Sequence, residues 1–70
     1  MSEKKFDNRF GTVAIKMGFI TYEQLLEALE VQLAEDLEGL ERRLTGQILQ
    51  EKNYLTSEQT DEVLIEMGFM

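Results

Sequence analysis

The chain repeats one pattern of residues after 35 positions, and this internal duplication restricts its fold more than any other feature. The aligned pairs are Gly11 and Gly46, Val13 and Ile48, Phe19 and Tyr54, Ile20 and Leu55, Thr21 and Thr56, Glu23 and Glu58, Gln24 and Gln59, Ala28 and Val63, and Leu29 and Leu64. A unit this short cannot bury its own apolar face, so repeat units become stable only when they pack together. We therefore expect a single domain in which two related halves share one core.

The composition is compatible with one small domain. The 70 residues are 43% hydrophobic, which argues against a wholly disordered chain. The repeat predicts a helical domain over residues 9–70, built from repeats 9–32 and 44–67 that the segment 33–43 joins. Residues 1–8 precede the first repeat, and we expect them to form a flexible N-terminus.

Helix start and stop signals occur at equivalent places in the two halves. Residues 21–24 and 56–59 both have threonine first and Glu-Gln last, which is the pattern of a capping box. Gly18 and Asn53 precede these caps, and Gly and Asn best tolerate the left-handed conformation that ends a helix. No alternating strand pattern competes with these signals. We predict an all-α domain of about four helices, arranged as two tandem helix-turn-helix repeats.

The end of the second helix is ambiguous in the sequence. Gly39 is a candidate stop, but acidic residues just before it would oppose the dipole of a helix that ended there. Arg42 and Arg43 would suit an end near Thr45. A row of leucines continues at helical spacing through the glycine: Leu33, Leu37, Leu40 and Leu44. We predict a helix from about residue 22 to the low forties with this row in the core, and a homodimer seam as the alternative.

Charge is concentrated in one segment. The net charge is −7, and the segment from Thr21 to Glu41 holds seven acidic residues and no Lys or Arg. Binding to a nucleic-acid polymer is unfavourable for such a chain, because it depends on Lys and Arg. The segment is either a solvated helix face or an acidic surface for a basic partner. The candidate partner-docking residues are Glu23, Glu27, Glu30, Glu35, Asp36 and Glu38.

The residue types offer little chemistry. The chain has no histidine and no cysteine. A Ser or Thr nucleophile would therefore lack its usual general base, and the commonest zinc ligands are missing. The acidic residues follow a helix and not the loop spacing of a calcium site. No apolar segment approaches the roughly 20 residues of a membrane span, and none resembles a signal peptide. We predict no catalytic residues, no metal, no cofactor, no membrane insertion and a cytoplasmic location.

The repeat unit resembles the motif of MshE-type N-terminal (MshEN) domains, which precede the bacterial ATPases of type II secretion and type IV pilus assembly. The resemblance covers residues 9 to 67 and rests on Arg9-Phe10-Gly11, Gly18-Phe19-Ile20, Leu25, Ala28-Leu29 and Gln32. In that family the motif normally occurs twice in tandem. The resemblance implies a helical domain that binds cyclic di-GMP or docks on other proteins of the secretion machine.

The two copies differ in how well they match the family motif. The resemblance implies a ligand-binding role for Arg9, Phe10, Gly11, Gly18, Leu25 and Gln32 in the first copy. In the second copy Leu44, Asn53 and Met67 replace the arginine, the second glycine and the closing glutamine. We therefore predict a non-catalytic adaptor or regulatory module that docks on a protein of a secretion, pilus or motility machinery. The alternative is a cyclic di-GMP receptor that uses the intact first motif.

Overall fold

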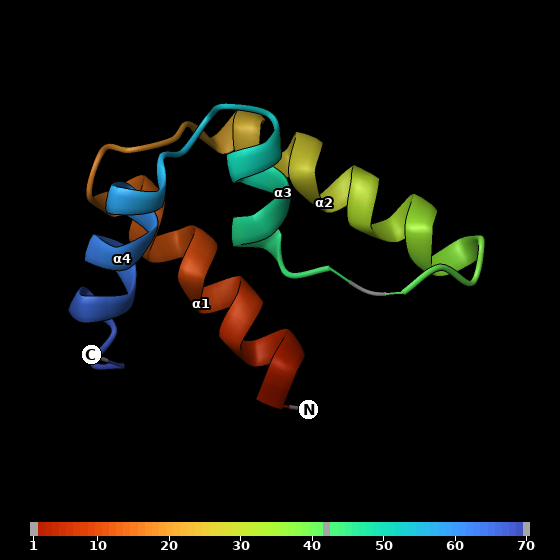
Figure 1. Ribbon diagram of the computed structural model, residues 1–70, viewed down its shortest axis with the longest axis horizontal. Coiled ribbons are helices and arrows are strands. Elements are labelled where there is room, and N and C mark those ends of the chain that lie inside the picture. Colours follow the sequence, from red (N-terminus) through yellow and green to blue (C-terminus); the bar gives the residue numbers. More distant parts are fainter. Residues whose placement is uncertain (1, 42, 70) are drawn as a thin grey trace.

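The computed structural model describes residues 2–41 and 43–69, with side chains from residue 6 onward. Four helices occupy these residues: α1 (Ser2–Lys16), α2 (Tyr22–Leu37), α3 (Thr45–Glu51) and α4 (Ser57–Glu66) (Figure 1). The described residues contain no strand. The predicted all-α class with about four helices is confirmed.

Helix α1 begins earlier than the sequence predicts. Residues 2–8, for which the sequence predicts a flexible N-terminus, form its first turns; Met1 lies outside the described residues. Later contacts explain the difference. The ring of Phe6 packs against that of Phe69 with centroids 5.3 Å apart, and the carboxylate of Asp7 is buried. Contacts with residues distant in sequence stabilise this part of α1, so local sequence signals do not reveal it.

Both predicted capping boxes are confirmed. The hydroxyl of Thr21 accepts a hydrogen bond from the Gln24 amide at 3.1 Å, and the Gln24 side chain accepts one from the Thr21 amide at 3.0 Å. Thr56 and Gln59 make the same two bonds, each at 3.0 Å. Each box satisfies two of the backbone donors that a helix start leaves without a partner.

The predicted helix stops at Gly18 and Asn53 are also confirmed. Their φ angles are +80° and +65°, in the left-handed region. The residue after each one donates its amide to a carbonyl in the last turn, Phe19 to Ala14 and Tyr54 to Leu49, both at 3.0 Å. This is the Schellman arrangement. Helix α4 ends in the same way, with Gly68 at a φ of +89°.

Helix α2 ends at Leu37, and the predicted continuation into the low forties is wrong. Gly39 has a φ of +75°, and its amide donates to the Asp36 carbonyl at 3.1 Å. The amide of Leu40 donates to the Glu35 carbonyl at 2.9 Å, so α2 ends in the same Schellman arrangement as the other three helices. The glycine conformation and these two bonds outweigh the unfavourable placement of acidic groups at a helix C-terminus. Arg42, which entered the prediction, lies outside the described residues.

The two halves pack across each other. Helices α1 and α3 are in contact, α2 packs against α3 of the other half, and α4 packs against α1. The contact of α2 with α3 corresponds to that of α4 with α1, so the two halves pack on each other in the same way. The buried apolar residues come from both repeats: Phe10, Ala14, Ile20, Ala28, Ile48, Leu49, Leu55 and Val63. Aligned positions such as Ala14 and Leu49 are both fully buried, so neither half has a complete core alone.

The C-terminal part of α2 projects past the other helices. In Figure 1 it extends to the right of the other helices, and the segment after it returns beneath it toward α3. Residues 36–41 are all exposed. The same helix packs against α3 and buries Ala28 and Gln32, so it contributes both to the core and to an outlying surface.

Candidate docking surface

The outward face of α2 carries large apolar side chains that the described residues do not cover. The exposed fractions are 62% for Tyr22, 40% for Leu26, 58% for Leu33 and 79% for Leu37. At about 100° of rotation per residue, these four side chains fall within an arc of roughly 60°. Ala28 and Gln32, which are buried, lie on the other side of the helix. We call Tyr22, Leu26, Leu33 and Leu37 the outer stripe.

The prediction that the leucine row lies in the core is wrong for three of its four members. Leu33, Leu37 and Leu40 are exposed, and only Leu44 is half-buried. The physical reason is that α3 covers the face of α2 that carries Ala28 and Gln32. The leucines point away from α3, and Leu40 follows the end of the helix.

Of the six predicted docking acids, Glu35 is held within the chain by an ion pair. Arg43 Nη2 lies 2.6 Å from Glu35 Oε2, and Arg43 Nη1 lies 2.8 Å from Glu51 Oε1. Hydrogen bonds to Glu35 and then to Glu51 raise the pKa of Arg43 above its ordinary value. The guanidinium therefore joins α2 to α3, and Glu35 is engaged in holding the fold.

Glu27 is engaged in the same way. Lys52 Nζ lies 3.1 Å from Glu27 Oε2, and the Tyr54 hydroxyl donates to Glu27 Oε1 at 2.9 Å. The hydrogen bonds from Lys52 and then Tyr54 lower the pKa of Glu27. The hydrogen bond to Glu27 also raises the pKa of the Tyr54 phenol, because it stabilises the protonated hydroxyl. Glu27 thus fastens α2 to the second repeat.

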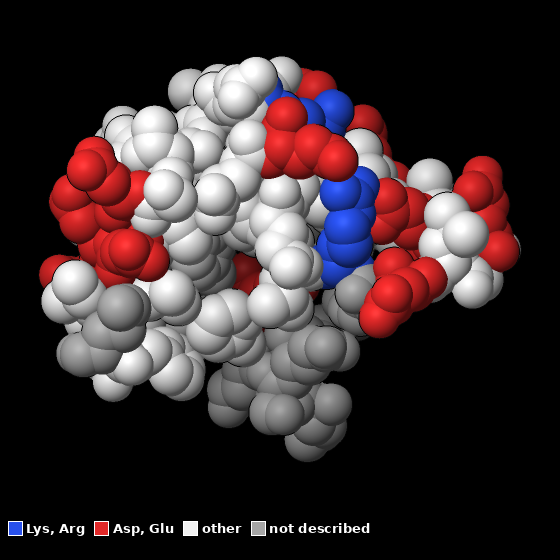
Figure 2. Space-filling model, in the orientation of Figure 1, with Lys and Arg blue, Asp and Glu red and all other residues white. Residues whose placement is uncertain are grey.

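The other four docking candidates lie on exposed positions. Glu23, Glu30 and Asp36 are on α2, and Glu38 directly follows it. By helical rotation, Glu23 and Glu30 flank the outer stripe on one side and Asp36 flanks it on the other. Figure 2 shows acidic side chains at the far end of α2 and over α4, with basic side chains near the junction of α2 and α3. The outer stripe therefore has acidic borders.

The residues that the resemblance assigns to a ligand mostly serve packing. Phe10 is in the core. Gly11 is buried against α2, where an added methyl group would lie 2.7 Å from Leu25 Cδ1. The glycine thus allows α1 and α2 to approach, and Leu25 fills the space beside it. Gly18 is an exposed helix stop, as described above.

Gln32 forms the centre of a buried polar cluster. Its Nε2 donates to Asp7 Oδ2 at 2.7 Å and to the Arg43 carbonyl at 2.8 Å. Asp7 Oδ1 accepts from the Thr45 amide at 3.3 Å, at the start of α3. Leu44, the N-cap of α3, has no side-chain acceptor, so Asp7 supplies both an acceptor and a negative charge there. Gln32 and Asp7 thereby join α1, α2 and α3.

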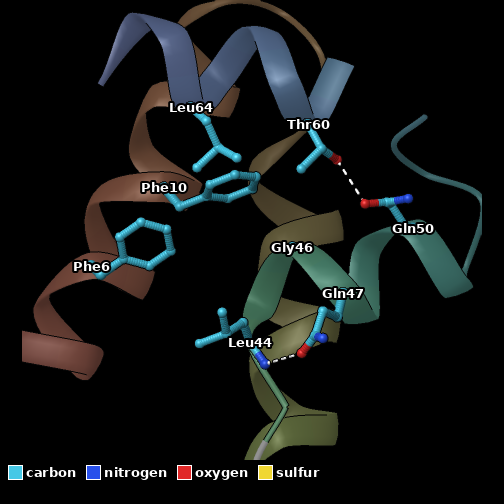
Figure 3. A pocket seen from close by; sticks show the side chains of 8 residues that line it. All are labelled: Phe6, Phe10, Leu44, Gly46, Gln47, Gln50, Thr60 and Leu64. Carbon is cyan, nitrogen blue, oxygen red and sulfur yellow. Dashed lines mark hydrogen bonds between the residues drawn. The ribbon is translucent and has the colours of Figure 1, made fainter. Parts of the chain in front are cut away.

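Arg9 is the one charged member of the assigned ligand set, and it is exposed on α1. Phe10 is the one member that lines the hollow between α1, α3 and α4 (Figure 3). The structure therefore does not bring the six residues together around this hollow.

The hollow is small and apolar. Phe6, Phe10 and Leu64 form its apolar walls, and its volume is about 100 Å³. Small-molecule sites usually enclose about 300–1,000 Å³. Two polar side chains on its wall bond to each other, since Thr60 Oγ1 donates to Gln50 Oε1 at 3.0 Å. This geometry suits one apolar side chain better than a nucleotide.

Neither a metal site nor a membrane span is found in the described part of the chain. No three acidic side chains there gather as potential metal ligands. None of its helices is both long and apolar enough to cross a membrane.

Comparisons of the chain with profiles of known protein families, with curated protein sequences and with solved structures found no match.

Proposed function

We propose that this domain is a non-catalytic adaptor or regulatory module that binds a protein partner through the outward face of α2. The observation that carries the proposal is the outer stripe, a straight row of exposed apolar side chains on a helix that projects from the molecule. Burying one leucine side chain contributes roughly 1.5–3 kcal/mol, so leaving several in water on an ordered helix is unfavourable. Exposed apolar patches with polar borders are typical of protein-binding surfaces.

The chain offers no histidine or cysteine for catalysis, which supports a non-catalytic role. A partner in a secretion, pilus or motility machinery rests on the family resemblance. The cytoplasmic location rests on a sequence in which no apolar segment reaches the length of a membrane span. Cyclic di-GMP binding is the second candidate, and the exposed Arg9 in the matching first motif supports it.

Affinity capture with matched variants tests the adaptor function. The wild-type domain, the double variant Leu33→Asp/Leu37→Asp and the control Ile65→Asp would each capture proteins from a lysate of the source cells. Ile65 is an exposed apolar residue on α4, so the control makes the same chemical change on a different surface. Circular dichroism should show an unchanged fold, because substitutions at exposed positions usually change stability by about 0.5 kcal/mol or less.

Quantitative mass spectrometry of the captured proteins gives the readout. We expect at least one protein that the wild type and Ile65→Asp retain and that the double variant loses. Identical sets of captured proteins for all three would rule out the outward face of α2 as the docking surface.

A further inference from the structure

We propose that the partner segment is a basic amphipathic helix that lies along the outer stripe, an inference that rests on the adaptor function proposed above. Its apolar face would cover the leucines, and its Lys or Arg residues would meet the acidic borders of α2.

The shape of the surface favours a helix as the partner. The outer stripe runs from Tyr22 to Leu37, which corresponds to about 22 Å at 1.5 Å per residue. Its members recur at the spacing of one helical face, so a second helix with apolar residues every three or four positions can follow it. The end of α2 projects past the other helices (Figure 1), and Leu33 and Leu37 on it are exposed, so a partner can reach this face. A segment of about 15 residues spans the stripe.

The charge of the surface favours a basic partner. Helix α2 contains no Lys or Arg, and Glu23, Glu30 and Asp36 border the stripe. Arg43, which precedes α3, and Lys52, which follows it, are paired with Glu35 and Glu27 of α2. An approaching helix therefore meets negative charge along the edge that carries Glu23 and Glu30, and Lys or Arg at the matching edge of that helix would be attracted.

The same charges argue against a second copy of the chain and against an anionic lipid surface as the occupant of the outer stripe. A second copy would place the acidic borders of one α2 against those of another, and each chain carries a net charge of −7. Like charges placed opposite each other across an interface oppose association. An anionic lipid surface attracts helices with Lys and Arg beside their apolar face, and α2 has Glu and Asp there.

Two synthetic peptides test the proposal directly. Both carry leucines at the spacing of one helical face; one has Lys and Arg on both flanks of that face, and the other has Glu. Each labelled peptide is titrated with the full 70-residue chain, and binding is followed by fluorescence anisotropy. We expect the basic peptide to bind at least about tenfold more tightly than the acidic peptide, with an affinity that falls as salt is added.

Variants of the chain locate the bound peptide. Leu33→Asp/Leu37→Asp should weaken the basic peptide by at least about tenfold, as expected for central apolar contacts, and Ile65→Asp should not. Glu23→Lys/Glu30→Lys should weaken the basic peptide and strengthen the acidic one. Full retention of basic-peptide binding by the leucine variant would overturn the proposal, because the peptide would then bind elsewhere.

Other outcomes identify what fails. Equal binding of both peptides would overturn the charge argument. A dimer in analytical ultracentrifugation that the leucine variant abolishes would show that a second copy covers the stripe. If the basic peptide does not bind, but Leu33→Asp/Leu37→Asp loses native partners in the capture experiment, the partner class is refuted and the adaptor function stands. If the basic peptide does not bind and Leu33→Asp/Leu37→Asp retains every native partner, both the partner class and the adaptor function are refuted.

Discussion

Gln32 Nε2 donates a 2.7 Å hydrogen bond to the buried carboxylate of Asp7, a residue 25 positions earlier in the chain. Gln32 is the last residue of the first copy of the repeated motif, and this bond gives it a structural role. The resemblance implies a ligand contact for Gln32. In the structure its amide instead donates to Asp7 on α1 and to the backbone carbonyl of Arg43. Fold maintenance alone therefore accounts for the glutamine.

The variant Asp7→Ala should lower the free energy of unfolding by about 1–3 kcal/mol, because it removes acceptors from the buried Gln32 amide and from the start of α3. Urea denaturation measures the change. Asn8→Ala is the matched control, since Asn8 is the exposed neighbour on the same helix turn. Equal stability of Asp7→Ala and the control would show that the cluster is not a structural clamp.

Substitutions at Gly18 test the left-handed helix stop. Gly18→Val should destabilise the domain by more than about 1 kcal/mol, because a β-branched residue is penalised at positive φ. No atom lies within 4 Å of the position that an added methyl group would take, so any loss comes from the backbone and not from crowding. Gly18→Asn should cost less, as Asn53 already adopts this conformation at the equivalent stop. Similar melting temperatures for wild type and Gly18→Val would contradict the assignment.

The hydrogen bond between Tyr54 and Glu27 predicts a pH dependence. Glu27 raises the pKa of the Tyr54 phenol, so this bond contributes stability below the pKa of an unfolded tyrosine. That contribution is lost as the pH rises through the higher pKa of the folded state. Tyr22→Phe leaves Tyr54 as the one tyrosine, and the absorbance of tyrosinate then reports its titration. Adding Glu27→Gln should shift this titration to lower pH; an unchanged titration would show that the bond does not form in solution.

Calorimetry tests the second candidate function, cyclic di-GMP binding, against the packing roles of the residues that would form its site. We expect no saturable heat when the domain is titrated with about 100 μM cyclic di-GMP, a concentration that would detect a Kd near 1 μM. The reason is that Phe10, Gly11, Leu25 and Gln32 are engaged in packing or in buried hydrogen bonds. Saturable binding that Arg9→Ala abolishes would instead establish the receptor function.

Sequence reasoning succeeded where the determining contacts are local. The caps at Thr21 and Thr56 and the stops at Gly18 and Asn53 depend on backbone bonds to residues at most five positions away. The repeat also predicts that the two halves share one core, and the aligned residues Ala14 and Leu49 are indeed both buried in it.

The misses concern contacts between distant parts of the chain. Asp7 acts as an acceptor for the start of α3, and nothing near Leu44 in the sequence indicates it. The burial of Ala28 and Gln32 in place of Leu33 depends on which face of α2 meets α3, and leucine is the more hydrophobic residue. One signal was available: the segment 22–37 carries apolar residues on two faces, and a domain of two short repeats covers only one of them.

Site-specific photo-crosslinking in living cells tests the central claim most directly. A photoreactive amino acid would replace Leu33 on the outer stripe in one variant and Ile65 on α4 in another. The account predicts a crosslinked adduct with a second, different protein from position 33 and not from position 65. An adduct from position 65 alone, or a position-33 adduct that contains only a second copy of this chain, would contradict it.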